Sequence, residues 1–70
     1  MSNSLIFQRK DVIDIRHTSS LTGAYFVVRV SPQQSFRATR PVMNALFNAQ
    51  PDDKFVAKKK RIYWYIEEVE

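Results

Sequence analysis

The chain has 70 residues and a net charge of +4, with no cysteine and a single glycine. Such a length accommodates one domain, residues 1–70. The absence of cysteine excludes disulfides and thiolate metal sites, and a single glycine cannot build a glycine-rich phosphate loop. No apolar run is long enough to span a bilayer and the first residues lack a signal-peptide pattern, so we expect a cytoplasmic protein without a membrane partner.

Two strands are predicted in the first half of the chain. Residues 12–17, VIDIRH, alternate apolar and polar side chains, which predicts a half-buried strand. Residues 24–30, AYFVVRV, are rich in the β-branched and aromatic side chains that favour strands. The connection between them, HTSSLTG, is too short for a parallel crossover and predicts an antiparallel hairpin. Residues 5–7, LIF, either begin the first strand or pack as an N-terminal arm.

One helix is predicted after the connection SPQQSFRATRP. Thr39 is a candidate N-cap, and Pro41 is tolerated in the first helical turn. The apolar residues Val42, Met43, Leu46 and Phe47 have the spacing of one helical stripe. The sequence QPDD ends the helix, and a helix this short needs a sheet to pack on.

The last residues, KFVAKKKRIYWYIEEVE, predict a short strand over residues 54–57, a lysine turn and a long strand over residues 61–69. A single kinked strand is the alternative. The predicted fold class is therefore α+β, with a small antiparallel sheet of three to four strands in the order β-β-α-β-β and one short helix packed on one face.

The alternation divides this sheet into two faces. The apolar face, expected to meet the helix, consists of Ile13, Ile15, Phe26, Val28, Val30, Ile62, Trp64 and Ile66. The opposite face consists of Asp14, Arg16, Tyr25, Val27, Arg29, Arg61, Tyr63 and Tyr65. A register slip of one residue would exchange the two faces, so the face that the helix covers stays open.

The second face and the cationic run suggest a binding surface. Its candidate residues are Lys58, Lys59, Lys60, Arg61, Tyr63, Tyr65, Tyr25, Arg29, Arg37 and Arg40. Aromatic rings stack on unpaired bases while cations contact phosphates. Arg37 and Arg40 come just before the predicted helix, whose N-terminus attracts anions. Against this, tyrosines also stabilise sheets by cross-strand packing alone, and charge runs are often only solvated.

Catalysis is not expected. His17 has no evident orienting carboxylate, and the paired aspartates are too few and too near cations to indicate a metal. We therefore predict a non-enzyme without cofactor or small-molecule substrate. Two functions stay open: a module that binds nucleic acid, DNA or RNA, and a small phage or mobile-element accessory protein that inhibits or modulates a larger host protein complex. Homodimerisation through the sheet edges is a further possibility.

Overall fold

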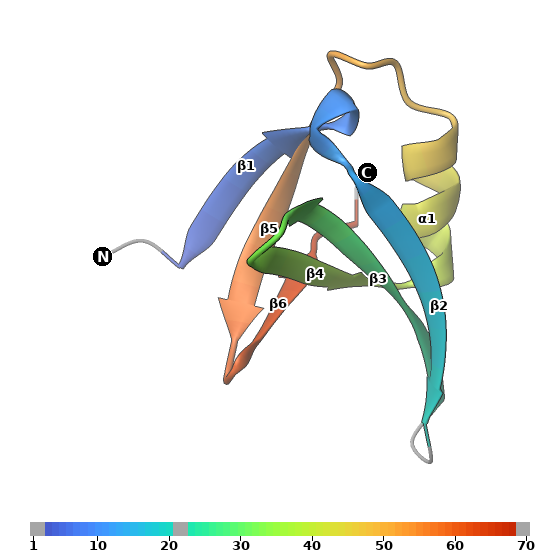
Figure 1. The fold of residues 1–70 in the computed structure, drawn as a ribbon, viewed down its shortest axis with the longest axis vertical. Coiled ribbons are helices and arrows are strands. Elements are labelled where there is room, and N and C mark those ends of the chain that lie inside the picture. The colour runs from blue at the N-terminus through green and yellow to red at the C-terminus, as the bar shows by residue number, and fades with distance from the viewer. Residues whose placement is uncertain (1–2, 21–22, 69–70) are drawn as a thin grey trace.

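The computed structural model describes residues 3–20 and 23–68 (Figure 1). Within these residues it contains the strands β1 (Ser4–Gln8), β2 (Asp14–Ser20), β3 (Gly23–Ser31), β4 (Gln34–Ala38), β5 (Lys54–Lys60) and β6 (Tyr63–Ile66). A short 3-10 helix, η1 (Arg9–Asp11), links β1 to β2, and the helix α1 (Arg40–Phe47) links β4 to β5. The small α+β character expected from the sequence is confirmed.

The predicted three- to four-stranded antiparallel sheet is wrong. The sheet has six strands in the order β1-β5-β6-β4-β3-β2, and it is mixed because β4 and β6 run parallel. The strands that the prediction lacked are β1, which the sequence left as a possible arm, and β4, which it treated as part of a loop. The antiparallel hairpin of β2 and β3 is confirmed, although residues 21 and 22 of its turn lie outside the described part.

The sheet curls into a partly open barrel. Its two outermost strands, β1 and β2, are consecutive in the chain and are joined through η1 (Figure 1). The rings of Phe7 in β1 and Phe36 in β4 stack with centroids 5.2 Å apart, although β5 and β6 lie between these strands in the sheet. In a flat sheet three strand spacings would separate β1 from β4 by roughly 14 Å. The contact therefore crosses the interior of the barrel.

The bend at η1 is fixed by hydrogen bonds to α1 and to the loop that leads into β5, the strand paired with β1. The backbone N–H of Arg9 donates to the Asp53 carbonyl at 2.9 Å, and that of Lys10 donates to the Pro51 carbonyl at 3.0 Å. The Arg9 side chain also donates from Nε to the Leu46 carbonyl at 3.0 Å, near the end of α1. The segment between β1 and β2 is thus tied both to α1 and to the loop that follows it.

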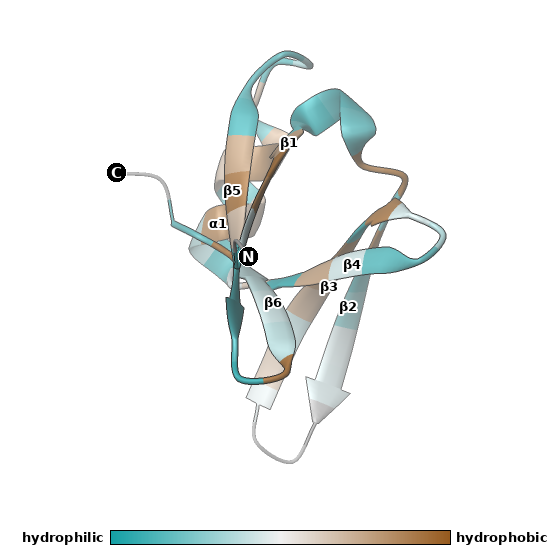
Figure 2. Ribbon diagram, turned by 90° about the vertical axis from the view of Figure 1, so that its left-hand side faces the viewer, coloured by the Kyte–Doolittle hydropathy of each residue, from teal (hydrophilic) through white to brown (hydrophobic). Residues whose placement is uncertain are grey.

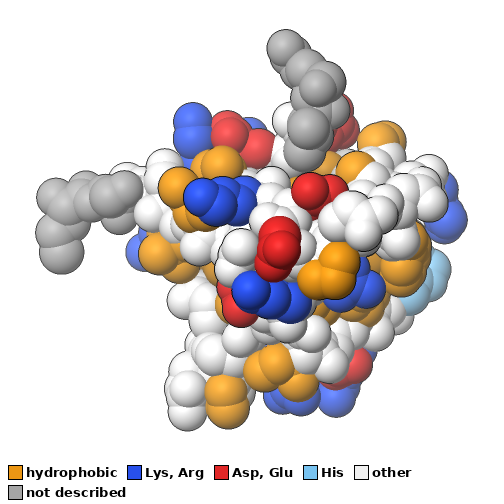
Figure 3. Space-filling view, turned by 90° about the horizontal axis from the view of Figure 1, so that it is seen from above, with side chains coloured by type: hydrophobic (Ala, Val, Ile, Leu, Met, Phe, Trp, Pro, Cys, Tyr) orange, Lys and Arg blue, Asp and Glu red, His pale blue; other side chains and the backbone are white. Residues whose placement is uncertain are grey.

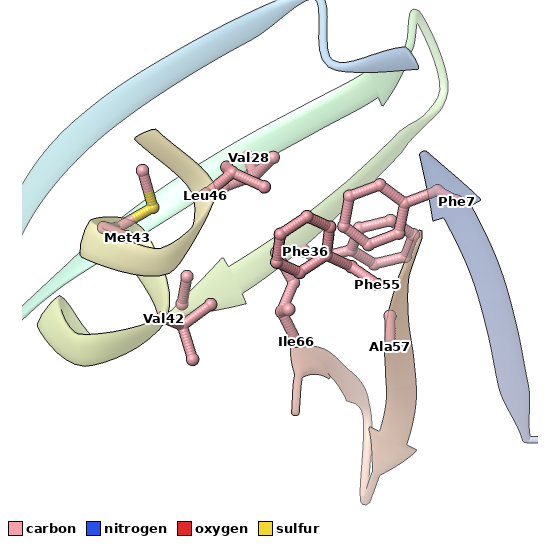
Figure 4. Close-up of a cluster of buried hydrophobic side chains, with 10 residues drawn as sticks. Phe7, Val28, Phe36, Val42, Met43, Leu46, Phe55, Ala57 and Ile66 are labelled. Carbon is pink, nitrogen blue, oxygen red and sulfur yellow. The ribbon is translucent and has the colours of Figure 1, made fainter. Parts of the chain in front are cut away.

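Figure 4 shows the buried core, to which α1 contributes Val42, Met43 and Leu46. The strands contribute Phe7, Val28, Phe36, Ala38, Phe55, Ala57 and Ile66. Of the predicted apolar face, Val28 and Ile66 are buried, while Ile15, Phe26, Val30 and Trp64 pack against the core from partly buried positions. The helix thus packs toward the predicted face, which is the inside of the barrel.

Three predicted core residues are exposed instead. Ile13 is 58% exposed, Phe47 60% and Ile62 75%. Ile13 lies between η1 and β2, Phe47 is the last residue of α1, and Ile62 lies in the turn between β5 and β6. Each belongs to the end of an element or to a connection, where the periodicity of the neighbouring strand or helix no longer determines which side a residue faces.

Several predicted boundaries also need correction. The lysine run is not a turn, because β5 continues to Lys60 and the turn consists of Arg61 and Ile62. The last strand ends at Ile66, and Val69, where it was expected to end, lies outside the described residues. Thr39 does occupy the N-cap position, but its side chain makes no capping hydrogen bond. Its hydroxyl instead donates to the Glu68 carboxylate at 3.4 Å.

Candidate nucleic-acid interface

One row of side chains runs across the outer surface of the barrel. In the strand registers, Val27 of β3 lies opposite Arg37 of β4, and Arg37 lies opposite Tyr65 of β6. Tyr65 in turn lies opposite Lys58 of β5. Because residues directly opposite one another share a face of the sheet, these four strands present the row together, on the side away from the core.

Arg37 is held between two tyrosine rings on this surface. Its guanidinium carbon lies 4.4 Å from the ring centre of Tyr25 and 3.6 Å from that of Tyr63. Both distances are within the range of a cation–π interaction. We call these three residues the tyrosine–arginine stack. Since its members come from β3, β4 and β6, the stack is ordered by the sheet itself and not by a flexible loop.

Two shallow grooves flank the stack and share Arg37, Ile62 and Tyr63 in their walls. The first, which we call the basic groove, is also lined by Lys60, Arg61, Thr39, Tyr65, Glu67 and Glu68. The second, which we call the aromatic groove, is also lined by Tyr25, Val27, Gln33, Gln34 and Ser35, and it reaches Phe36 and Trp64, whose rings meet inside the barrel. Charged groups therefore gather on one side of the stack, and rings, amides and a hydroxyl on the other.

The turn between β5 and β6 contributes Ile62 to both grooves. Figure 2 shows the chain changing there from hydrophilic to hydrophobic. Arg61 has φ 59°, in the left-handed region that residues other than glycine seldom adopt. This conformation costs about 1–2 kcal/mol, and the two-residue turn that joins Lys60 to Tyr63 requires it, because tight β-hairpin turns favour a positive φ at their first central residue. The result is an exposed Ile62 directly between a cation and a tyrosine.

The cationic run is divided between two faces. Lys58 lies opposite Tyr65 and Lys60 opposite Tyr63, so both lysines share the face of the tyrosines. Lys59 lies opposite Trp64, whose ring packs against Phe36 inside the barrel. Lys59 therefore belongs to the other face, although all three lysines are exposed. The sequence alone grouped them as one cluster.

The two arginines before the helix lie in different surroundings. Arg37 belongs to β4 and to the stack, whereas Arg40 is the first residue of α1 and its guanidinium lies 5.4 Å from the Phe26 ring centre. Arg29 shares the outer face, but there it lies 3.8 Å from the Asp14 carboxylate. Neither Arg29 nor Arg40 lines either groove.

Sequence reasoning missed several groove residues. Gln33, Gln34 and Ser35 were taken as part of a loop, and no pattern distinguished them. Ile62 was assigned to the core because it continues the alternation of Trp64 and Ile66. The neighbouring KKKR run was the available signal for a turn there, but the prediction placed that turn a few residues too early.

The opposite end of the barrel has a different surface. Figure 3 views the molecule from the side of η1 and the loop between α1 and β5, where cationic and anionic side chains are intermixed. One such pair joins Lys10 and Asp52 at 3.2 Å. Among residues 3–20 and 23–68 there is no group of three potential metal ligands, and no helix in that part is long and apolar enough to cross a membrane.

Comparison of the chain with protein-family models, with curated proteins and with solved structures finds no match. The chemistry and geometry of the outer face are therefore the basis for assigning a function.

Proposed function

We propose that the protein binds single-stranded nucleic acid on the outer face of β3, β4 and β6 and that it catalyses no reaction. The observation that carries this proposal is the tyrosine–arginine stack beside the basic groove. Bases stack on exposed aromatic rings with about 1–3 kcal/mol each. Tyr63 is 43% exposed, so part of its ring is available to a base even with Arg37 against it.

The same surface suits an unpaired strand better than a duplex. Rings can stack on bases only when the bases are splayed out of a helix, as in single-stranded DNA or RNA. Lys60 and Arg61 line the groove next to Tyr63, where they would contact the phosphates of a strand whose bases reach the stack. The amides of Gln33 and Gln34 in the aromatic groove are suited to base edges.

The architecture supports the proposal by analogy. If β1 and β2 are counted as one bent strand, the barrel has five strands with a helix between the third and the fourth. This arrangement resembles the OB-fold, a partly open Greek-key barrel. OB-folds bind oligonucleotides on the face of strands 2 and 3 and with the loop between strands 4 and 5. The equivalents here are β3, β4 and the Arg61–Ile62 turn. A shared architecture alone does not determine function.

The test uses the position of the three lysines, since Lys58 and Lys60 share the face of the tyrosines and Lys59 belongs to the other face. Fluorescence anisotropy with labelled oligothymidine, the corresponding RNA and a duplex would be measured at about 50 and 200 mM salt. We expect the single strands to bind, and K58A/K60A to lower the slope of log affinity against log salt by up to roughly 0.7 for each lysine that contacts a phosphate. K59A is the matched control because it removes the same charge from the other face. Absence of binding at low salt, or an equal effect of K59A per lysine, would contradict the proposal.

The exposed Ile62 favours a second candidate, docking to a larger host protein complex. Isoleucine at 75% exposure beside Tyr63 and Arg61 resembles a protein-binding hot spot, in which aromatic residues and arginine dominate. In that case I62A should weaken capture of the partner more than K58A/K60A does. If the protein acts in the cytoplasm, as the cysteine-free sequence suggests, either partner is accessible to it.

A further inference from the structure

The segment that follows β6 brings two carboxylates into the basic groove. The Glu67 N–H donates to the Val56 carbonyl at 2.8 Å, and a Glu67 carboxylate oxygen lies 3.1 Å from the Lys58 Nζ. Glu68 accepts the hydrogen bond from the Thr39 hydroxyl. Both glutamates line the groove together with Lys60 and Arg61. We call Glu67 and Glu68 the acidic clasp.

The clasp occupies two groups that an anionic ligand could use, Lys58 beside the groove and Thr39 in its wall. Lys58 is one of the two lysines on the face of the tyrosines, and its ammonium group is already paired with Glu67. A phosphate that approaches Lys58 has to displace this carboxylate. A phosphate that enters the groove near Thr39 meets the negative charge of Glu68, whose carboxylate accepts the hydrogen bond of the Thr39 hydroxyl.

The ion pair is not required to hold the chain in place. The backbone bond from Glu67 to Val56 already fixes this segment along β5. The side chains of Lys58 and Glu67 are 48% and 43% exposed, and ion pairs this accessible to water contribute little to stability and break readily. The carboxylate is therefore well suited to be exchanged for another anion.

We propose that Glu67 and Glu68 act as an internal competitor for the basic groove, so that every polyanion has to displace them before it binds. The identity of the natural ligand rests on the proposed function, but the competition itself does not. Because the clasp must open for any polyanion, its removal strengthens binding of different polyanions by the same factor. The stacking of bases then decides which polyanion binds most tightly.

The test compares E67Q and E67Q/E68Q with the wild-type protein and with D52N. Glutamine keeps the size of glutamate and removes its charge. D52N is the matched control, because Asp52 is an exposed carboxylate 3.2 Å from Lys10, in the loop at the other end of β5. D52N changes the net charge by the same amount as E67Q. Salt screens the interaction between exposed charges that are more than about 10 Å apart. Far-UV circular dichroism would verify folding. If E67Q/E68Q does not fold, the comparison of E67Q with D52N carries the test.

Two probes separate this inference from the proposed function. Labelled oligothymidine offers phosphates and bases, whereas long-chain inorganic polyphosphate, followed by calorimetry, offers charge alone. We expect E67Q to raise the affinity for both probes about two- to fivefold at low salt, and D52N to change neither appreciably. Freeing Lys58 should also steepen the salt dependence.

Each outcome has a distinct meaning. If E67Q and E67Q/E68Q change polyphosphate binding no more than D52N does, the internal competitor is overturned, even if oligothymidine binds well. If these variants strengthen polyphosphate binding but oligothymidine binds no better than polyphosphate, the competitor is supported and the nucleic-acid function is overturned.

Discussion

Two neighbouring residues of β4 belong to aromatic clusters in opposite environments. Phe36 lies inside the barrel against Phe7, which also stacks on Phe55 at 5.7 Å. Arg37 lies outside between Tyr25 and Tyr63. One strand thus alternates between a cluster of phenylalanine rings and a cluster that carries a charge and two hydroxyls.

The comparison separates stability from recognition. The inner rings gain free energy because they leave water, and they join strands that are not neighbours in the sheet. The outer stack is only partly buried, and a cation–π contact at an exposed site contributes about 0.5–1 kcal/mol. The inner cluster therefore contributes to the stability of the barrel, whereas the outer one contributes little to it and is the surface proposed to bind a ligand.

The largest expected effect comes from removing one ring of the inner cluster. F36A should lower the free energy of unfolding by about 3–5 kcal/mol, because it removes a ring that is 2% exposed and leaves a cavity between β1 and β4. Urea denaturation followed by Trp64 fluorescence would measure the loss. For a domain this small such a loss is a large part of the total stability, so F36L serves as a milder companion. A loss below about 1 kcal/mol for F36A would contradict the barrel interior described above.

A smaller effect, on binding and not on folding, is expected from changing the neighbouring residue, Arg37. R37A should weaken oligothymidine binding about tenfold, because it removes a cation and leaves Tyr25 and Tyr63 without the group that orders them. The free energy of unfolding should fall by less than about 1 kcal/mol. R37K, which keeps the charge but not the planar group, should recover only part of the affinity. If R37A destabilised the fold as much as F36A, the division between the two clusters would not hold.

The smallest expected effect is a gain in stability. R61G should raise the free energy of unfolding by up to about 1 kcal/mol, because glycine adopts the positive φ without steric cost. The same change should weaken oligonucleotide binding by removing a cation from the basic groove. Thermal unfolding and anisotropy would be measured on the same preparation. A stability loss would show that the Arg61 side chain contributes more to folding than its backbone strain costs.

The sequence predicted the strands with strong patterns. The run AYFVVRV became β3 nearly residue for residue, because β-branched and aromatic residues dominate it. The short strand β4 was missed because its five residues, QSFRA, contain only two that face the core, Phe36 and Ala38. The parallel pairing of β4 with β6 is a tertiary contact that no local pattern encodes.

The failure to predict β4 also limited the prediction of the site. The alternation placed Tyr25, Tyr63 and Tyr65 on one face, and their strand registers agree with this. Arg37, however, was assigned to a helix terminus, since without β4 there was no strand to carry it between the tyrosines. The lysines were predicted as a turn, so the alternation that separates Lys59 from Lys58 and Lys60 was not applied to them.

The pairing of β1 with β5 has a consequence for how the protein folds. Ser4 pairs with Lys58, so β1 cannot find its partner until β2, β3, β4, α1 and β5 have been synthesised. Contacts this distant in sequence slow folding, because the entropy of closing the loop is lost before the contact forms. Until β1 docks, β5 presents an unpaired edge with Phe55 and Ala57 beside it. During this interval the chain is most exposed to association with other unfolded chains.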